Sequence, residues 1–149
     1  MTRVLFVCLG NICRSPTAEG VLRARAAAAG LALFVDSAGT GGWHVGEAPD
    51  RRAQAEARKR GYDLSAQRAR QAMAQDFRDF DLIFAMDRSN LTALQRLRPA
   101  DGAADLALFL DLLPGQPLRE VPDPYYEDGF DTVLTLIEDG CDALIRRLG

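Results

Sequence analysis

The chain begins with a short apolar run that passes through a polar, glycine-containing loop directly into a helix start. Residues 3–7 (RVLFV) predict a buried strand, because the run is short and apolar and the pattern breaks after it. Ser15 suits the N-cap of the following helix, since its oxygen can accept an orphan backbone N–H, and Pro16 suits the first helical position. A strand that leads straight into a helix is typical of a sheet covered by helices.

The alternation of strands and helices continues to the end of the chain. Further strands are predicted at residues 33–37, 81–86 and 106–110, and further helices at about 50–60, 87–98 and 129–148. The last helix carries an apolar stripe at spacings of three and four, in which Cys141 is a packing residue. We therefore expect the α/β class, with a four-stranded parallel sheet and helices on both faces. With 149 residues, the simplest organisation is a single domain over residues 1–149.

Residues 113–128 interrupt this rhythm. The segment (LPGQPLREVPDPYYED) is rich in proline and has neither a helical nor a strand period. Structureless loops of this length in a compact domain are usually functional, so we expect this one to contribute to a site.

Composition excludes several other classes of protein. The net charge of −3 argues against a nucleic-acid-binding surface, which is normally basic. The three cysteines (Cys8, Cys13 and Cys141) are an odd number, which argues against a disulfide framework. The C-x4-C spacing of the first two is not that of a zinc knuckle, and the single His44 excludes a multi-histidine metal site. The first apolar stretch ends without the small-residue cleavage site of a signal peptide, and no run approaches the ~18 apolar residues of a membrane span. We therefore expect a cytoplasmic protein without stable membrane insertion.

The loop after the first strand predicts an anion site. It ends at a helix N-terminus, where backbone N–H groups and the helix dipole favour an anion, and successive inward N–H groups can wrap a phosphate. Gly10 is expected to allow the backbone conformations that such a cradle demands. The G-x-x-x-x-G-K-[ST] pattern of ATP-binding loops is absent. The expected phosphate-binding residues are Leu9, Gly10, Asn11, Ile12, Cys13, Arg14 and Ser15.

A cysteine at the start of this loop and an arginine six residues later indicate the chemistry. N–H donors and the guanidinium of Arg14 favour the thiolate of Cys8, which would face the phosphorus of a bound monoester. Arg14 can hold two phosphate oxygens through its fork, and Ser15 can hydrogen-bond the sulfur. A bare C-x5-R spacing also arises by chance, with Cys8 as a buried strand end and Arg14 as a solvated charge. The strand-loop-helix context favours the functional interpretation.

The residues VCLGNICRSP resemble the active-site loop of the low-molecular-weight protein tyrosine phosphatase family. The resemblance covers essentially the whole chain, through VDSAGTGGWHVGEAPDRRA, QRARQ, DLIFAMDRSN and VPDPYYEDGFDTV in order. It implies a four-stranded parallel sheet with helices on both sides and hydrolysis of protein phosphotyrosine through a phosphocysteine on Cys8. It implies no metal and no cofactor, and tyrosine-phosphorylated proteins as partners. We expect a monomer or a weak homodimer.

The same resemblance assigns roles outside the loop. It implies that Asp123 is the general acid that protonates the leaving tyrosine oxygen and later activates water. Ser37 matches a serine that hydrogen-bonds Asn11, and Gln67 stands where eukaryotic members often carry histidine. Cys13 could form a reversible disulfide that shields Cys8 from overoxidation, or be an inert filler. Asp87 is a candidate helix cap, with a charge influence on the loop as the weaker alternative. The expected walls of the substrate cleft are Trp43, His44, Tyr125 and Tyr126.

Three other functions stay open beside this one. A thioredoxin-linked arsenate reductase shares the loop but needs two further cysteines around residues 75–90, where this chain has none. Phosphoarginine phosphatases tend to carry Thr where this loop has Ile12, and they lack the double tyrosine. A catalytically silent phosphopeptide-binding module would need neither the thiol of Cys8 nor the acid Asp123.

Overall fold

Four parallel strands form one sheet in the order β2-β1-β3-β4 in this computed structural model. The structure describes residues 1–149, apart from the side chain of Glu127. The strands are β1 (Thr2–Cys8), β2 (Leu33–Gly39), β3 (Leu82–Ala85) and β4 (Asp105–Leu108). The predicted four-stranded parallel sheet is confirmed.

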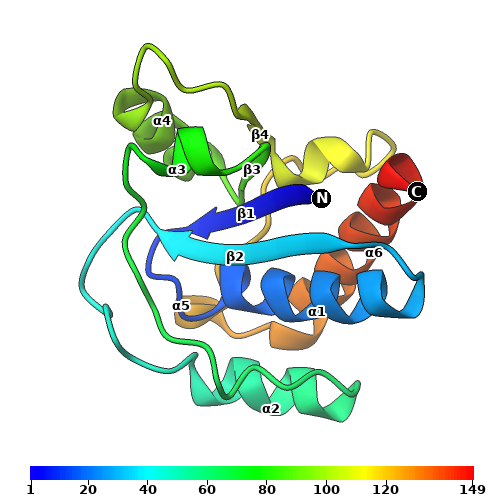
Figure 1. The fold of residues 1–149 in the computed structure, drawn as a ribbon. Coiled ribbons are helices and arrows are strands. Elements are labelled where there is room, and N and C mark those ends of the chain that lie inside the picture. The colour runs from blue at the N-terminus through cyan, green and yellow to red at the C-terminus, as the bar shows by residue number, and fades with distance from the viewer.

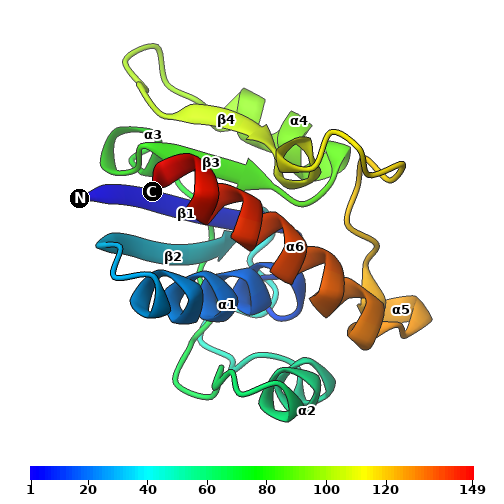
Figure 2. The same cartoon turned by 90° about the vertical axis from the view of Figure 1, so that its right-hand side faces the viewer.

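Helices cover both faces of the sheet, as predicted. They are α1 (Arg14–Ala28), α2 (Arg51–Lys59), α3 (Asp76–Asp79), α4 (Arg88–Leu97), the 3-10 helix η1 (Phe109–Leu112), α5 (Pro124–Glu127) and α6 (Phe130–Leu148). Figure 2 shows α6 crossing one face beside α1, while α3 and α4 lie on the far side. Helix α2 packs at the edge of this arrangement, against α6 and α1.

The alternation of side chains along β1 fills two cores. Val4, Phe6 and Cys8 face the layer of α1 and α6, and Leu5 and Val7 face the layer of α3 and α4. All five are buried, as expected for a central parallel strand that is covered on both faces. The period of two therefore places the Cys8 side chain on the α1 side of the sheet, at the end of its strand.

Several element boundaries differ from the sequence-based predictions. The fourth strand ends at Leu108, and the predicted strand residues Phe109 and Leu110 start the 3-10 helix η1 instead. Phe109 turns into the core, where its ring packs edge-on against Phe6 at a centroid distance of 5.7 Å. The short helices α3 and α5 were missed, because four residues are too few for a periodic signal.

The ends of the helices depend on local chemistry. Gly30 and Gly61 adopt positive φ angles of 67° and 91° and end α1 and α2, as predicted. The predicted N-cap role of Ser15 is wrong. Cys13 is the N-cap residue of α1 and Ser15 already lies within the helix, because its hydroxyl is used elsewhere.

The first strand lies at the point where the chain changes direction across the sheet. The chain passes from β1 to β2 on one side of β1, and later elements return it to β3 on the other side. In open α/β sheets, ligands bind at the carboxyl ends of the strands where the strand order reverses in this way. Figures 1 and 2 agree that α5 lies at this end of the sheet and both chain termini at the opposite end.

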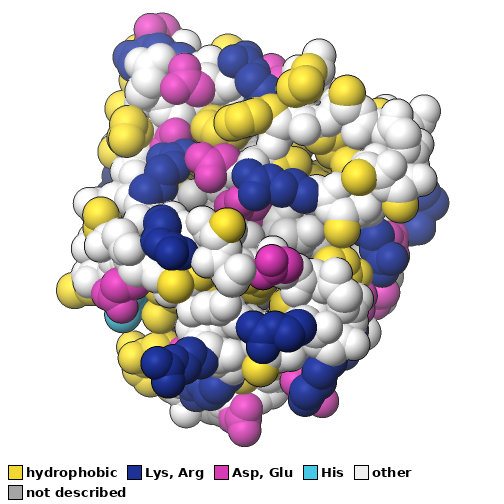
Figure 3. Space-filling model, turned by 60° about the horizontal axis from the view of Figure 1, so that its bottom comes forward, with side chains coloured by type: hydrophobic (Ala, Val, Ile, Leu, Met, Phe, Trp, Pro, Cys, Tyr) yellow, Lys and Arg dark blue, Asp and Glu magenta, His cyan; other side chains and the backbone are white. Residues whose placement is uncertain are grey.

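Acidic and basic side chains are mixed on the face shown in Figure 3, without a continuous patch of one sign. None of the helices in the described residues combines the length and apolarity that crossing a bilayer requires.

Candidate active site

The loop over residues 8–15 joins β1 to α1 and turns its carbonyl groups outward. Three of these carbonyls accept hydrogen bonds of 2.8–2.9 Å from backbone N–H groups outside the loop: Cys8 from Thr40, Leu9 from Gly41 and Ile12 from Asp50. Within the described residues, the N–H groups of residues 10–14 have no protein acceptor. The loop is therefore pinned from outside by its acceptors, and its donors remain for an anion at the helix start.

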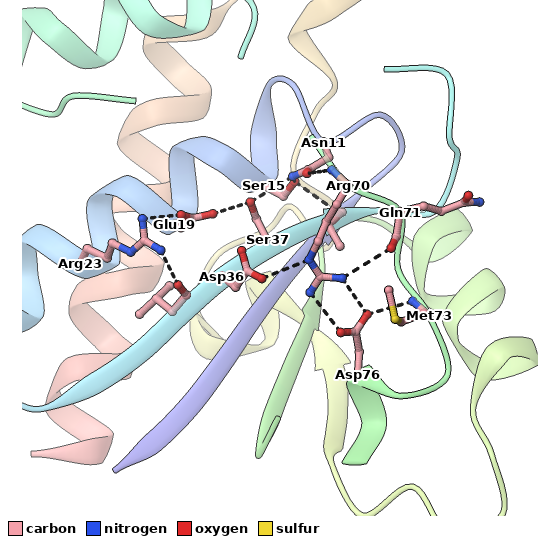
Figure 4. Close-up of polar contacts among 12 residues, drawn as sticks. Asn11, Ser15, Glu19, Arg23, Asp36, Ser37, Arg70, Gln71, Met73 and Asp76 are labelled. Atoms are coloured by element: carbon pink, nitrogen blue, oxygen red, sulfur yellow. Dashed lines mark hydrogen bonds and ion pairs between the residues drawn. The ribbon is translucent and has the colours of Figure 1, made fainter. Parts of the chain in front are cut away.

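Asn11 is the residue that gives the loop its curvature. It adopts a left-handed φ of 56°, which asparagine tolerates better than most residues. Its Oδ1 accepts from the backbone N–H of Arg70 at 3.0 Å, and its Nδ2 donates to Ser15 Oγ at 2.8 Å and to Ser37 Oγ at 3.0 Å. Figure 4 shows this side chain at the meeting point of three segments of the chain. These three bonds stabilise the left-handed conformation.

Gly10 serves a different purpose from the predicted one. Gly10 does not adopt a positive φ; Asn11 is the residue of this loop that does. A Cβ at Gly10 would lie 3.0 Å from Cδ2 of His44, so the glycine is needed for the close approach of the His44 ring to the loop.

The hydroxyl of Ser15 lies 3.0 Å from Cys8 Sγ, and both atoms are buried. Because Ser15 Oγ accepts a hydrogen from Asn11, its own proton is available for the sulfur; the alternative acceptor, the carbonyl of Ala38, is farther away at 3.3 Å. A hydroxyl that donates to sulfur supports the thiolate form of Cys8.

The polar network extends away from the loop to a buried carboxylate that sequence reasoning missed. Ser37 Oγ accepts from Asn11 and donates to Glu19 Oε1 at 2.6 Å, and the carboxylate of Glu19 pairs with Arg23 (Figure 4). Burial raises the pKa of Glu19, although Ser37 and Arg23 both favour its charge. The i,i+4 spacing of Glu19 and Arg23 in α1 was the available sequence signal.

Arg70 anchors the network on its other side. Its guanidinium pairs with Asp76 at 3.0 and 3.1 Å and with Asp36 at 3.1 Å. These ion pairs fix the position of Arg70, whose backbone N–H donates to Asn11 Oδ1. Gln67 lies near but contacts helix α1 rather than Asn11, since its Nε2 donates to the carbonyl of Pro16 at 2.9 Å.

Arg14 is held by three groups at the floor of the site. Its side chain is only 3% exposed, and Nη1 donates to Asp87 Oδ2 at 2.7 Å and to the carbonyl of Val121 at 3.0 Å. Nη2 lies 3.6 Å from Asp123 Oδ2. Burial opposes the charge of Arg14, but Cys8, Asp87 and Asp123 outweigh it and its pKa is raised.

Asp87 does more than the predicted capping. Its Oδ1 accepts from Asn90 N at 2.8 Å and caps α4, as expected, while Oδ2 binds Arg14. The interpretation of Asp87 as a cap alone is therefore wrong, because its two oxygens serve both the helix and the loop.

A cleft of about 280 Å³ opens above Cys8. Its walls include all four predicted cleft residues, and Asp123 stands at its side. Tyr125 and Tyr126 meet edge-to-face with centroids 4.9 Å apart, and Trp43 is 72% exposed at the rim. The residues that line the cleft are Cys8, Leu9, Gly10, Ile12, Cys13, Arg14, Trp43, His44, Asp123, Tyr125 and Tyr126. Of the predicted site residues, only Asn11, Ser15 and Ser37 lie behind the cleft rather than on its surface.

All three cysteines carry free thiols. Burial raises the pKa of Cys13, followed by the nearby charge of Asp50, so Cys13 is a neutral thiol at ordinary pH. Cys141 is fully buried on the stripe of α6, as predicted. Across the described residues, no three His, Cys, Asp or Glu side chains are grouped so as to hold a metal ion.

The fold and the site define a class of protein: a cysteine-dependent phosphatase whose loop follows the first strand of a parallel sheet. A thiol below an N–H cradle, beside a guanidinium and a carboxylate, distinguishes this class from nucleotide-binding proteins with a similar strand-loop-helix start. The chain belongs to the low molecular weight phosphotyrosine protein phosphatase family, whose model matches residues 3–149. Its activity is accordingly that of a cysteine-dependent protein-tyrosine phosphatase, with phosphoproteins as substrates.

Individual relatives are similar over nearly the whole chain. The low molecular weight protein-tyrosine-phosphatase YfkJ of Bacillus subtilis is 44% identical over 99% of this chain and 96% of its own. The protein tyrosine phosphatase of Entamoeba histolytica superposes with a TM-score of 0.93 at 38% identity, covering 99% of this chain and 97% of its own. The Drosophila arginine phosphatase superposes with a TM-score of 0.92 at 34% identity, covering 99% and 97%.

Proposed function

We propose that this protein hydrolyses phosphotyrosine in proteins with Cys8 as the nucleophile, Arg14 as the phosphate-binding cation and Asp123 as the general acid, and that residues 1–149 act as one phosphatase domain. A single observation carries the proposal: one cleft holds a thiol, a buried guanidinium and a carboxylate, with Arg14 Nη2 3.6 Å from Asp123 Oδ2. A phosphate seated on the loop would contact all three groups.

The reaction has two displacement steps at phosphorus. In the first, the thiolate of Cys8 forms a bond to phosphorus, the bond to the tyrosine oxygen breaks, and Asp123 gives its proton to that oxygen. In the second, water attacks the phosphocysteine, loses a proton to Asp123 and releases inorganic phosphate and the thiolate. Arg14 binds the equatorial oxygens in both steps, and the hydroxyl of Ser15 supports the sulfur as it leaves. The chemistry balances without a metal ion or a cofactor.

The cleft walls support an aromatic ester as the substrate. Tyr125, Tyr126 and Trp43 present flat apolar surfaces between the rim and the loop, and Cys8, 3% exposed, lies at the floor. A phosphotyrosine side chain is long enough to pass these walls, whereas phosphoserine is short. Ile12 adds a further apolar wall.

Phosphoarginine is the second candidate substrate, because an arginine phosphatase shares the fold at 34% identity. The apolar wall of Ile12 favours a phenol ring over a polar guanidinium group. We therefore place phosphotyrosine first.

Cys13 is proposed to form a reversible disulfide with Cys8 after oxidation. Peroxide would convert the thiolate of Cys8 to a sulfenic acid, and the thiol of Cys13 would displace water to close the disulfide. Both residues line the same cleft, which supports the pairing. A Cys13→Ser variant should recover less activity than wild type after peroxide and a thiol reductant, and equal recovery would remove this role.

The remaining expectations concern binding partners, oligomeric state and cellular location. We propose a cytoplasmic protein that acts as a monomer or weak homodimer and binds no nucleic acid. The net charge of −3 and the mixed charges of the face in Figure 3 support the last point.

Turnover of a peptide panel tests the function. The wild type should release phosphate rapidly from phosphotyrosine peptides and slowly from phosphoserine and phosphoarginine peptides of the same sequence. Cys8→Ser should lose all turnover but still bind the phosphotyrosine peptide, which identifies an enzyme rather than a binding module. Faster release from phosphoarginine would favour the second candidate, and no turnover by the wild type would contradict the proposal.

A further inference from the structure

The start of helix α2 contacts both loops of the site. The backbone N–H of Asp50 donates to the carbonyl of Ile12 in the phosphate loop at 2.8 Å. Two residues later, Arg52 Nη2 donates to the carbonyl of Tyr125 at 3.3 Å, in the short helix α5 that follows Asp123. This short segment therefore joins two regions that are far apart in the sequence.

Asp50 and Arg52 also bind each other. The carboxylate of Asp50 accepts from Arg52 Nε at 3.1 Å and from Nη2 at 3.0 Å, and it caps α2 by accepting from the backbone N–H of Arg52 at 2.8 Å. Burial would raise the pKa of Asp50, but the hydrogen bonds from Arg52 outweigh it and the pKa is lowered. The carboxylate thus stays charged at neutral pH and holds the fork of Arg52 in one direction.

The guanidinium of Arg52 then lies over two aromatic rings that bracket the segment after Asp123. Its Cζ is 5.5 Å from the centroid of the Tyr125 ring and 4.8 Å from that of Phe130, the first residue of α6. Cation–π contacts of this kind favour one orientation of both rings.

Tyr125 connects Arg52 to the acid. Its backbone N–H donates to Asp123 Oδ1 at 3.1 Å, which leaves Oδ2 directed toward Arg14 and the cleft. Arg52 therefore holds the residue whose N–H orients the carboxylate.

We propose that Arg52 is a positioning residue for the general acid, and that with Asp50 it sets the distance of Asp123 from the phosphate loop. The inference rests on the proposed role of Asp123. Arg52 acts through Tyr125 and does not touch the phosphorus or the leaving oxygen. Its absence moves the acid relative to the phosphoryl group while leaving the thiol and the cradle in place.

The loss of activity on removing the Arg52 side chain should depend on how much the leaving group needs a proton. Phenyl phosphate has a leaving group as basic as tyrosine, whereas p-nitrophenol is much more acidic and leaves with less help. For Arg52→Ala we expect kcat/KM to fall about tenfold with phenyl phosphate and less than about twofold with p-nitrophenyl phosphate. A series of substituted aryl phosphates should accordingly show a steeper dependence of log kcat/KM on leaving-group pKa than the wild type.

Two further variants separate position from charge. Arg52→Lys keeps the positive charge but loses the fork that binds Asp50 through two nitrogens, so it should recover only part of the loss. Arg51→Ala removes an exposed arginine from the adjacent position of α2 and should leave the series unchanged. The rate of Cys8 alkylation by iodoacetate, and its protection by inorganic phosphate, should be the same in Arg52→Ala as in the wild type.

The outcomes are distinguishable. Full recovery by Arg52→Lys, an equal loss for all esters, or altered alkylation of Cys8 would each overturn the positioning role. Asp123→Asn in the same series tests the premise. If it fails to steepen the dependence, Asp123 is not the acid and the inference about Arg52 fails with it. If Asp123→Asn steepens the dependence but Arg52→Ala does not, only the inference about Arg52 is wrong.

Discussion

Arg14 and Asp87 form a nearly buried ion pair, with 2.7 Å between Arg14 Nη1 and Asp87 Oδ2. Arg14 follows β1 and Asp87 follows β3, 73 positions later in the sequence. The other oxygen of Asp87 caps α4, so the orientation of the Arg14 guanidinium depends on where that helix begins.

Asp87→Asn should separate the two roles of this side chain. Asparagine still caps a helix well but provides no charge for Arg14, which keeps only the carbonyl of Val121 and the more distant Asp123. We expect a loss of about 1–2 kcal/mol in the free energy of unfolding, below the 3–5 kcal/mol of a fully buried pair because Asp87 is 20% exposed. The value of kcat/KM should fall about tenfold. Urea unfolding and p-nitrophenyl phosphate turnover measure both effects, and a variant with unchanged activity would show that Asp87 only caps.

Gly39 is expected to be indispensable to the shape of the phosphate loop. A Cβ at this position would lie 2.9 Å from the carbonyl oxygen of Leu9 and 3.1 Å from the carbonyl carbon of Gly10, both backbone atoms that cannot rotate away. Gly39→Ala should destabilise the protein by about 1–3 kcal/mol and lower kcat/KM at least tenfold, because the loop must shift. Gly115→Ala is the matched control, since a Cβ there meets no atom within 4 Å. Equal activity of the two variants would contradict the prediction.

The buried carboxyl of Glu19 should give the stability a pH dependence of known sign. Its pKa is raised in the folded protein, first by burial, so the folded state holds this proton at a pH where the unfolded state has lost it. Its contribution to stability is therefore fully present below the ordinary pKa, about 4.5, and is lost as pH rises through the raised value. The free energy of unfolding of the wild type minus that of Glu19→Gln should therefore fall as pH rises above about 4.5. Urea titrations at several pH values measure the difference, and a rise with pH would refute the assignment.

Tyr62 should weaken the fold in alkali. Its hydroxyl donates to Glu138 Oε2 at 2.7 Å, and burial, together with this carboxylate, raises the pKa of Tyr62 to about 12. The unfolded chain ionises this phenol near pH ~10, so the stabilising contribution is present below pH ~10 and is lost as pH rises toward the folded value. Between pH ~9 and ~11 the free energy of unfolding of the wild type should fall by about 1 kcal/mol more than that of Tyr62→Phe. Urea unfolding at several pH values measures this loss. If the free energies of unfolding of the two proteins fell equally with pH over this range, the raised pKa of Tyr62 would be excluded.

The phosphate loop could be predicted because its signals are local. The apolar run over residues 3–7, Gly10 and the helix start at Ser15-Pro16 lie within one short stretch, and Cys8 and Arg14 are ordered by that stretch alone. The family resemblance then extended the prediction to Asp123, Tyr125 and Tyr126, whose places in the cleft agree with it.

Contacts between distant segments could not be predicted in this way. Three such contacts join residues whose spacing in the sequence carries no pattern. They are the ion pair of Asp87 with Arg14, the network from Asn11 to Glu19, and the contact of Arg52 with Tyr125. Ser15 illustrates the same limit. Its local chemistry suits an N-cap, but the proximity of Cys8 and Asn11 gives its hydroxyl other partners.

By itself, the sequence determined the α/β class and the strand-loop-helix start, and it singled out Cys8 as the proposed nucleophile, because hydrophobic period and helix-start chemistry act over a few neighbouring residues. Only the tertiary structure decided which carboxylates face Arg14, which residue takes the left-handed turn and which residues contact Asp123 and Tyr125. Those choices depend on how α2, α4 and the loop before α6 come together beyond the carboxyl ends of the strands, where residues more than a hundred positions apart come within hydrogen-bond distance.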